Sequence, residues 1–148
     1  MNLLEKIEAD LRESMKKGDK ERAETLKMLK SDLMYEKAKT GKDLTDEKML
    51  EVTARAAKKR KESIEEFRKG NREDLAAKEA AELKIIEEFL PKQMSEAEIE
   101  KYITDKVAAL GGVSKKDMGR VMGELMKELK GRADGSLVKS ILSKKVTE

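Results

Sequence analysis

The sequence contains no cysteine and no histidine. The absence of cysteine excludes disulfides, thiolate metal sites and cysteine nucleophiles. The absence of histidine removes the side chain that most often serves as a general base or metal ligand in proteins. The chain therefore lacks two side chains on which enzyme mechanisms often rely as nucleophile, general base or metal ligand. We predict a protein without catalytic residues, without a metal site and without a cofactor.

Aromatic residues are scarce, at 3% of the chain, and runs of β-branched residues are absent. Both are typical of β-strands, whereas the apolar residues of this chain recur at steps of three and four, the period of a helix. We therefore expect an all-α protein. No apolar run approaches the roughly 18 residues of a transmembrane helix, and the first residues lack a signal-peptide core. We accordingly expect a cytoplasmic protein that does not enter a membrane.

The chain has a single proline, Pro91, and we predict that it marks a domain boundary. The residue before a proline is pushed out of the α-helical region, so a helix should end at Leu90. Glycine-containing turns divide the apolar pattern upstream into four helices and the pattern downstream into three. We expect an N-terminal four-helix domain at residues 1–91 and a smaller three-helix domain at residues 92–148.

Helix ends upstream of Pro91 can be placed from turn and capping residues. Gly18 should end the first helix, and Asp19, Thr45 and Asn71 are candidate N-caps for the next three. The inward faces of the first two helices are expected to include the two methionines Met15 and Met34.

Two helix starts downstream of Pro91 have the same signature. Ser95 and Glu98 have the spacing of a capping box, and Ser114 and Asp117 repeat the arrangement of a polar cap followed by an acid three residues later. Asp134 is the candidate N-cap of the last helix, which we expect to run to about residue 145. These signals predict helices that begin just after each cap.

The charge of the chain is unevenly distributed. Residues 1–91 hold 22 basic and 22 acidic side chains, whereas residues 113–145 hold nine basic and four acidic ones, a local charge of +5. Such an asymmetry favours a polyanionic partner for the basic part, although many solvated helices are mildly basic without binding anything.

Glycines interrupt the same basic region. Gly119 and Gly123 lie one turn apart within a helical pattern, where each costs about 1 kcal/mol relative to alanine. Gly131 is a candidate left-handed stop, within a connection that carries two cations and, we expect, exposed backbone amides. Close helix packing and a tight turn would explain these glycines, and so would a surface that a phosphate backbone approaches closely. The sequence leaves both interpretations open.

The candidate RNA-contacting residues combine these cations and glycines. They are Lys115, Lys116, Gly119, Arg120, Lys130, Gly131, Arg132, Gly135 and Lys139. Lysine and arginine supply phosphate contacts, and glycine permits close approach of the backbone. The region lacks an aromatic platform on which single-stranded bases could stack, so recognition of folded RNA by shape and backbone is the better match.

A second basic run, Lys58–Lys59–Arg60–Lys61, lies in the predicted third helix. Four successive residues cover the whole circumference of a helix, so one or two of these side chains must lie near the apolar face and extend outward from it. We favour structural support over RNA contact for this run.

Several motifs along the whole chain resemble the YqeY-like family. They are Met15–Arg22 with Thr25–Leu26, the run Lys58–Ser63, Arg72–Leu75 with Glu79 and Glu82, Leu90–Pro91, and the stretch from Asp117 through Gly135. From Ser95 onward the chain is also similar to the helical tail domain of the B subunit of tRNA-dependent amidotransferase. That resemblance implies a domain that holds tRNA and lies outside the catalytic portion. The chain departs from the family pattern at Lys59, where glutamine is common, and at Asn71, where glycine is common.

The leading hypothesis is a non-catalytic accessory protein that binds tRNA or a similar folded RNA through its C-terminal domain. A protein-interaction adaptor with a partner in tRNA metabolism is the competing class, because the basic surface could hold an acidic protein and the methionine-rich helix an apolar one. An association with tRNA-dependent amidotransferase, a carbon–nitrogen ligase that uses glutamine as amide donor, is the third.

Overall fold

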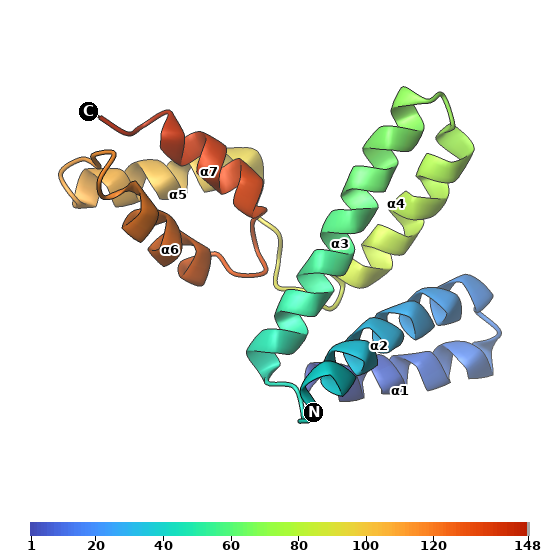
Figure 1. Ribbon diagram of the computed structural model, residues 1–148. Helices are drawn as coiled ribbons and strands as arrows, with labels where there is room; N and C mark the ends of the chain where they lie inside the picture. Colours follow the sequence, from blue (N-terminus) through green and yellow to red (C-terminus); the bar gives the residue numbers. More distant parts are fainter. Residues whose placement is uncertain (148) are drawn as a thin grey trace. The chain divides into compact units, whose positions relative to one another are not determined.

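The computed structural model describes residues 1–147, and within them the chain forms seven α-helices (Figure 1). They are α1 (Leu3–Lys17), α2 (Lys20–Thr40), α3 (Asp46–Lys69), α4 (Glu73–Glu87), α5 (Glu96–Ala109), α6 (Met118–Glu128) and α7 (Gly135–Ser143). Extended pairing in the described residues amounts to one isolated bridge between Ser114 and Thr147. The prediction of an all-α protein is confirmed.

The chain divides into two compact units. The N-terminal unit, Met1–Pro91, contains α1 to α4, and the C-terminal unit, Lys92–Glu148, contains α5 to α7. Each unit has its own cluster of buried apolar side chains.

The helix ends of the N-terminal unit follow local signals at all but two positions, both on α4. Gly18 has a left-handed φ of 74° and ends α1, and the side chains of Asp19 and Thr45 accept backbone hydrogen bonds at the starts of α2 and α3.

The first exception is the end of α4. This helix ends at Glu87 rather than at the predicted Leu90, and the three residues before Pro91 form a turn in which each N–H donates to the carbonyl three residues back. The other exception is Asn71, which the sequence suggested as the cap of α4. Arg72 precedes that helix instead, and Asn71 lies in the turn with a φ of 58°, a conformation that asparagine tolerates better than most residues.

The core of the N-terminal unit lies between the α1–α2 and α3–α4 hairpins and is built from residues such as Ile7, Leu26 and Leu33. Two residues that we expected to point inward do not. Met15 and Met34 are 57% and 42% exposed. The buried face of α1 continues from Leu11 to Ser14, and that of α2 passes through Leu33, so each methionine lies one residue beyond the buried face.

A half-buried arginine joins three parts of the N-terminal unit. Arg22 of α2 donates to both carboxylate oxygens of Asp10 on α1, at 2.8 and 2.6 Å, and to both carboxylate oxygens of Glu88, just after α4, at 2.8 and 3.1 Å. The hydrogen bonds from Arg22 lower the pKa of Asp10 and outweigh the effect of its burial, while the same bonds raise the pKa of Arg22. Bidentate pairs of this kind fix orientation as well as distance.

The basic run of α3 contains the inward-facing cation that the sequence required. The side chain of Arg60 is 12% exposed and lies 3.3 Å from Glu82 and 3.7 Å from Glu79, both on α4. Lys58, Lys59 and Lys61 are exposed. Arg60 thus ties α3 to α4, and the structural interpretation holds for this member of the run.

In the C-terminal unit, the capping box at the start of α5 is confirmed by reciprocal hydrogen bonds of 3.2 Å between Ser95 and Glu98. Asp134 caps α7 by accepting from the backbone N–H of Ser136 at 3.3 Å. That helix ends at Ser143, two residues earlier than expected.

The predicted cap at Ser114 is wrong. Ser114 lies in the bridge to Thr147, and its hydroxyl donates to the Asp117 carboxylate at 3.1 Å rather than accepting from a helix N–H. Residues 115–117 form a turn, and α6 begins only at Met118. Backbone pairing with the end of the chain therefore delays this helix by a full turn.

Replacing Arg22 with methionine should lower the free energy of unfolding by about 1–3 kcal/mol, because two carboxylates lose a charge-assisted partner. Arg22→Lys should recover only part of the loss, since an ammonium cannot form two bidentate pairs. The folded pKa of Asp10 lies below 3.8, so the difference from wild type should be full above pH 3.8 and shrink as the pH falls below it. Urea unfolding at several pH values measures this.

Arg72→Ala is the control for that series. Arg72 pairs with Asp74 at 3.2 Å, but both side chains are more than half exposed. Such surface pairs contribute about 0–1 kcal/mol. Equal losses for Arg22→Met and Arg72→Ala would contradict the structural role of Arg22.

Candidate nucleic-acid interface

The predicted RNA-contacting residues lie on α6, on α7 and in the segments at either end of α6. Lys115 and Lys116 belong to the turn before α6, Gly119 and Arg120 to its first turns, Lys130, Gly131 and Arg132 to the α6–α7 connection, and Gly135 and Lys139 to α7. The eleven residues of α6 make it about 16 Å long. The candidates thus form two groups separated by the length of α6 rather than one compact patch.

Between these groups, one edge of α6 is bare. A Cβ atom added at Gly119 or Gly123 would have no atom of another residue's side chain within 4 Å, and no backbone atom outside the helix's own turn, and both glycines are exposed. Close packing therefore does not explain them within the described residues. Lys127 continues the same line at a four-residue step and is also exposed. We call Gly119, Gly123 and Lys127 the glycine edge.

The other two glycines have structural explanations. Gly131 adopts a left-handed φ of 74° after the end of α6, as predicted. A Cβ atom at Gly135 would lie 3.3 Å from the methyl carbon of Met126, so this glycine lets the start of α7 pack against α6. We expected Gly135 to admit a phosphate backbone, but Met126 occupies the space beside it.

The connection between α6 and α7 is tied to the segment that follows Pro91. The carbonyl of Gly131 accepts from the Gln93 side-chain amide at 2.5 Å, and the carbonyl of Arg132 accepts from the backbone N–H of Met94 at 2.9 Å. The expectation of exposed amides in this connection is wrong at Arg132 and at the following residue. Both N–H groups donate to the carbonyl of Leu129.

The cations of the region differ in their partners. Arg120 lies 3.4 Å from Glu124 and 3.9 Å from Asp117, so its charge is compensated locally. Lys116, Lys127 and Lys139 form no ion pair within residues 1–147 and are exposed. Lys139 lies one turn after Gly135, whose neighbour is Met126, so it is on the side of α7 nearest α6.

The opposite edge of α6 carries a polar cluster that sequence reasoning missed. Glu128 accepts from the Lys106 ammonium at 2.7 Å and from the Tyr102 hydroxyl at 2.8 Å, and Lys106 lies 3.2 Å from Glu124. Both partners are on α5. We call Glu124 and Glu128 the acidic edge. Tyr102 and Lys106 are four residues apart on α5, as are the two acids on α6. This spacing predicts that each pair shares one face of its helix, but it does not predict that the two pairs meet.

These contacts shift the pKa values of Glu128, Lys106 and Tyr102. Hydrogen bonds from Lys106 and then Tyr102 lower the pKa of Glu128, despite its partial burial. The hydrogen bond to Glu128 raises the pKa of Lys106 and of Tyr102. The cluster is therefore ion-paired at neutral pH, and it fixes the acidic edge of α6 against α5.

Residues 1–147 contain no group of three or more acidic side chains placed to hold a metal ion. Among the described helices, none combines the length and apolar character needed to cross a bilayer.

The sequence profile of the family described as Yqey-like protein matches residues 4–146. The chain belongs to this YqeY-like family. Altered inheritance of mitochondria protein 41 of Pyrenophora tritici-repentis is 32% identical to it over 152 aligned residues, covering 99% of this chain and 80% of that protein. An uncharacterised protein of Schizosaccharomyces pombe is 39% identical over 94 residues, covering 64% of this chain and 76% of its own length.

A further relative is altered inheritance of mitochondria protein 41 of Lachancea thermotolerans. It is 33% identical to this YqeY-like chain over 107 residues, which cover 70% of the chain and 57% of that protein. The names of the Pyrenophora and Lachancea proteins place those proteins in mitochondria and state no biochemical activity.

The Tyr102–Glu128 contact makes a spectroscopic prediction. In a Tyr35→Phe background, Tyr102 is the single tyrosine and should ionise above its ordinary pKa of 10. Glu128→Gln should return that pKa towards 10, because the neutral amide accepts less strongly. A pH titration of the phenolate absorbance measures both values. The raised pKa means that this contact stabilises the fold below pH 10 and is lost as the pH rises through the folded value. Identical midpoints in the two variants would show that the contact does not form.

Proposed function

We propose that this YqeY-like protein binds tRNA or a similar folded RNA through the C-terminal unit, without catalysing a reaction on it. The proposed surface consists of the glycine edge of α6, the turn that precedes it and the adjoining side of α7. Its cations are Lys116, Lys127 and Lys139, with Lys115, Lys130 and Arg132 at the two ends.

The observation that carries this proposal is open helix backbone between exposed lysines. Gly119 and Gly123 present main chain with no side chain to hold a phosphate backbone away. Lys116 precedes this stretch and Lys127 follows it, and neither is paired with an acid in residues 1–147. The length of α6, about 16 Å, corresponds to roughly five steps of 3.4 Å along a nucleic-acid strand. An extended backbone contact fits this shape better than a single-phosphate site.

Recognition of folded RNA fits the composition of this surface. Sequence-specific binding of single strands relies on aromatic rings that stack with bases. Tyr102 is the one aromatic residue of the C-terminal unit, and its hydroxyl is bound to Glu128 of the acidic edge. The resemblance of the residues from Ser95 onward to the tail of the amidotransferase B subunit also favours tRNA.

The proposed surface leaves out two of the residues that the sequence suggested, because each has a local partner. Arg120 faces two carboxylates, and Gly135 packs against Met126. The sequence favours a cytoplasmic location, whereas the names of two relatives place those proteins in mitochondria.

An association with tRNA-dependent amidotransferase would add an enzymatic context, which an amidation assay with and without this chain tests.

The first test removes three cations. Changing Lys116, Lys127 and Lys139 together to alanine should weaken tRNA binding and reduce the slope of log affinity against log salt by about 0.9 for each phosphate that the variant no longer neutralises. Fewer counterions are then released on binding. Fluorescence anisotropy of labelled tRNA over a range of salt concentrations gives both quantities.

A charge-matched control separates this surface from a general loss of positive charge. Lys17, Lys69 and Lys101 are exposed, and each pairs with an acid on its own helix at 3.6, 3.7 and 2.9 Å. Changing these three to alanine removes the same charge and should leave the slope near the wild-type value. Equal effects of the two triple variants would contradict the proposed surface.

The second test uses the cost of glycine in a helix. Gly123→Ala should raise the free energy of unfolding by about 0.5–1 kcal/mol, because the added methyl group meets no neighbour. The same change should weaken tRNA binding, since it covers open backbone. Gly135→Ala is the control for stability, because its Cβ would crowd Met126. A Gly123→Ala protein that is more stable but binds tRNA unchanged would remove the glycine edge from the interface.

The adaptor hypothesis is favoured by a different observation. Met15, Met28 and Met34 of the N-terminal unit are each more than 40% exposed. Exposed methionines adapt well to apolar partners. A pull-down with and without nuclease distinguishes the two functions, because RNA-mediated capture is lost on nuclease treatment and direct protein capture is retained.

A further inference from the structure

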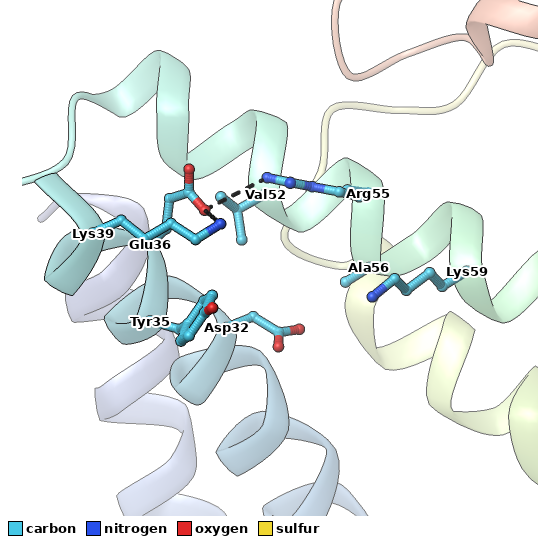
Figure 2. A pocket seen from close by; sticks show the side chains of 8 residues that line it. All are labelled: Asp32, Tyr35, Glu36, Lys39, Val52, Arg55, Ala56 and Lys59. Atoms are coloured by element: carbon cyan, nitrogen blue, oxygen red, sulfur yellow. Dashed lines mark ion pairs between the residues drawn. The ribbon is translucent and has the colours of Figure 1, made fainter.

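The N-terminal unit contains a pocket between α2 and α3 with a volume of about 210 Å³ (Figure 2). Val52 and Ala56 of α3 are buried and supply apolar surface to it. Tyr35 of α2 also lines it and is 67% exposed. The pocket is smaller than the roughly 300–1,000 Å³ that encloses a whole small molecule, so it suits a group that is only partly enclosed.

Three cations line the pocket together with the tyrosine. The Lys39 ammonium lies 4.9 Å from the centroid of the Tyr35 ring. Arg55 and Lys59 line the pocket from α3, opposite Tyr35 and Asp32, which belong to α2 (Figure 2). Lys59 is exposed and forms no ion pair within residues 1–147. An exposed aromatic ring beside basic side chains is the arrangement that proteins use for a stacked base and its phosphate.

The one half-buried acid of the pocket holds cations in place rather than repelling an anion. Glu36 lies 3.4 Å from Lys48, 3.7 Å from Lys39 and 3.9 Å from Arg55. Partial burial raises the pKa of Glu36, but the hydrogen bond from Lys48 and the charges of the three cations outweigh it and lower that pKa. Arg55 has only the longest of the pairs with Glu36 and is half exposed. Lys48 also lies 3.3 Å from Glu51. The pocket lining itself holds three cations, Lys39, Arg55 and Lys59, and two acids, Asp32 and Glu36, so it carries a net charge of +1.

We propose that this pocket binds one nucleotide, with its base stacked on Tyr35 and its phosphate held by Arg55 and Lys59. Asp32 lies beside Tyr35 in the pocket lining (Figure 2), where its carboxylate can accept a hydrogen bond from the exocyclic amino group of a stacked base. The ligand is either a free nucleotide or an unpaired nucleotide of an RNA chain, since both present a base with an attached phosphate. This site stands independently of the proposed surface on α6 and α7, because it uses other residues in the other unit.

The test titrates the full chain with AMP, with adenosine and with a short single-stranded oligoadenylate, following backbone amide signals by NMR. AMP should shift the signals of Tyr35, Arg55 and Lys59. Tyr35→Ala should weaken AMP binding by about fivefold or more, and Tyr35→Phe should retain it, because the ring and not the hydroxyl stacks. Lys59→Ala should weaken binding of AMP but not of adenosine. Tyr35 and Lys59 are exposed, so these variants should unfold at the wild-type temperature.

The oligoadenylate arm identifies the source of the nucleotide. Tighter binding of the oligonucleotide than of AMP, still dependent on Tyr35, assigns the pocket to RNA, and the reverse order assigns it to free nucleotides. The alanine variant of Lys116, Lys127 and Lys139 should bind AMP as wild type does, so a failure of the C-terminal surface leaves this result unchanged. Unmoved signals at Tyr35, wild-type affinity of Tyr35→Ala, or equal shifts with inorganic phosphate alone would overturn the proposal.

Discussion

The rotational setting of α6 about its own axis determines which side chains of the C-terminal unit reach solvent. Its apolar side, which includes Val121 and Leu125, is buried, and contacts with α5 and α7 flank that side. On the acidic edge Glu128 is bonded to Lys106 and Tyr102 of α5, and towards α7 Met126 fills the space left by Gly135. The helix cannot turn without breaking an ion pair or exposing apolar surface. Its two glycines and Lys127 are therefore directed outward.

Whether a cation forms an ion pair depends on which helix edges carry the acids. In the N-terminal unit, Arg22 and Arg60 lie between pairs of carboxylates and serve to join helices. In the C-terminal unit, Glu124 and Glu128 lie on the edge of α6 that faces α5, so Lys116, Lys127 and Lys139 have no acid to pair with in the described part of the chain. The net charges of the two regions, zero for residues 1–91 and +5 for residues 113–145, do not tell whether a given cation is paired with an acid or unpaired. Lys59, exposed in the pocket that Tyr35 also lines, shows that an overall neutral unit can still offer a cation to a ligand.

Local signals predicted much of the fold. The capping box of Ser95 and Glu98 and the left-handed turns at Gly18 and Gly131 depend on residues within four positions of each other, and the structure confirms them. Ser114 has the same kind of local signal but does not cap a helix. Its backbone pairs with Thr147 at the far end of the chain, a contact that no local pattern reports.

The sequence by itself determined that this protein is all-α, where most of its helices begin and end, and that positive charge is concentrated after Pro91. The tertiary structure alone decided that Gly135 is filled by Met126 while Gly119 and Gly123 stay open, that Arg120 is compensated, and that Tyr35 lines a pocket with cations of the next helix. Helical period and caps act over one turn of the chain, so sequence spacing reports them. Which edges of two helices meet depends on how all the apolar faces of a unit are buried together, and spacing along one helix carries no information about that.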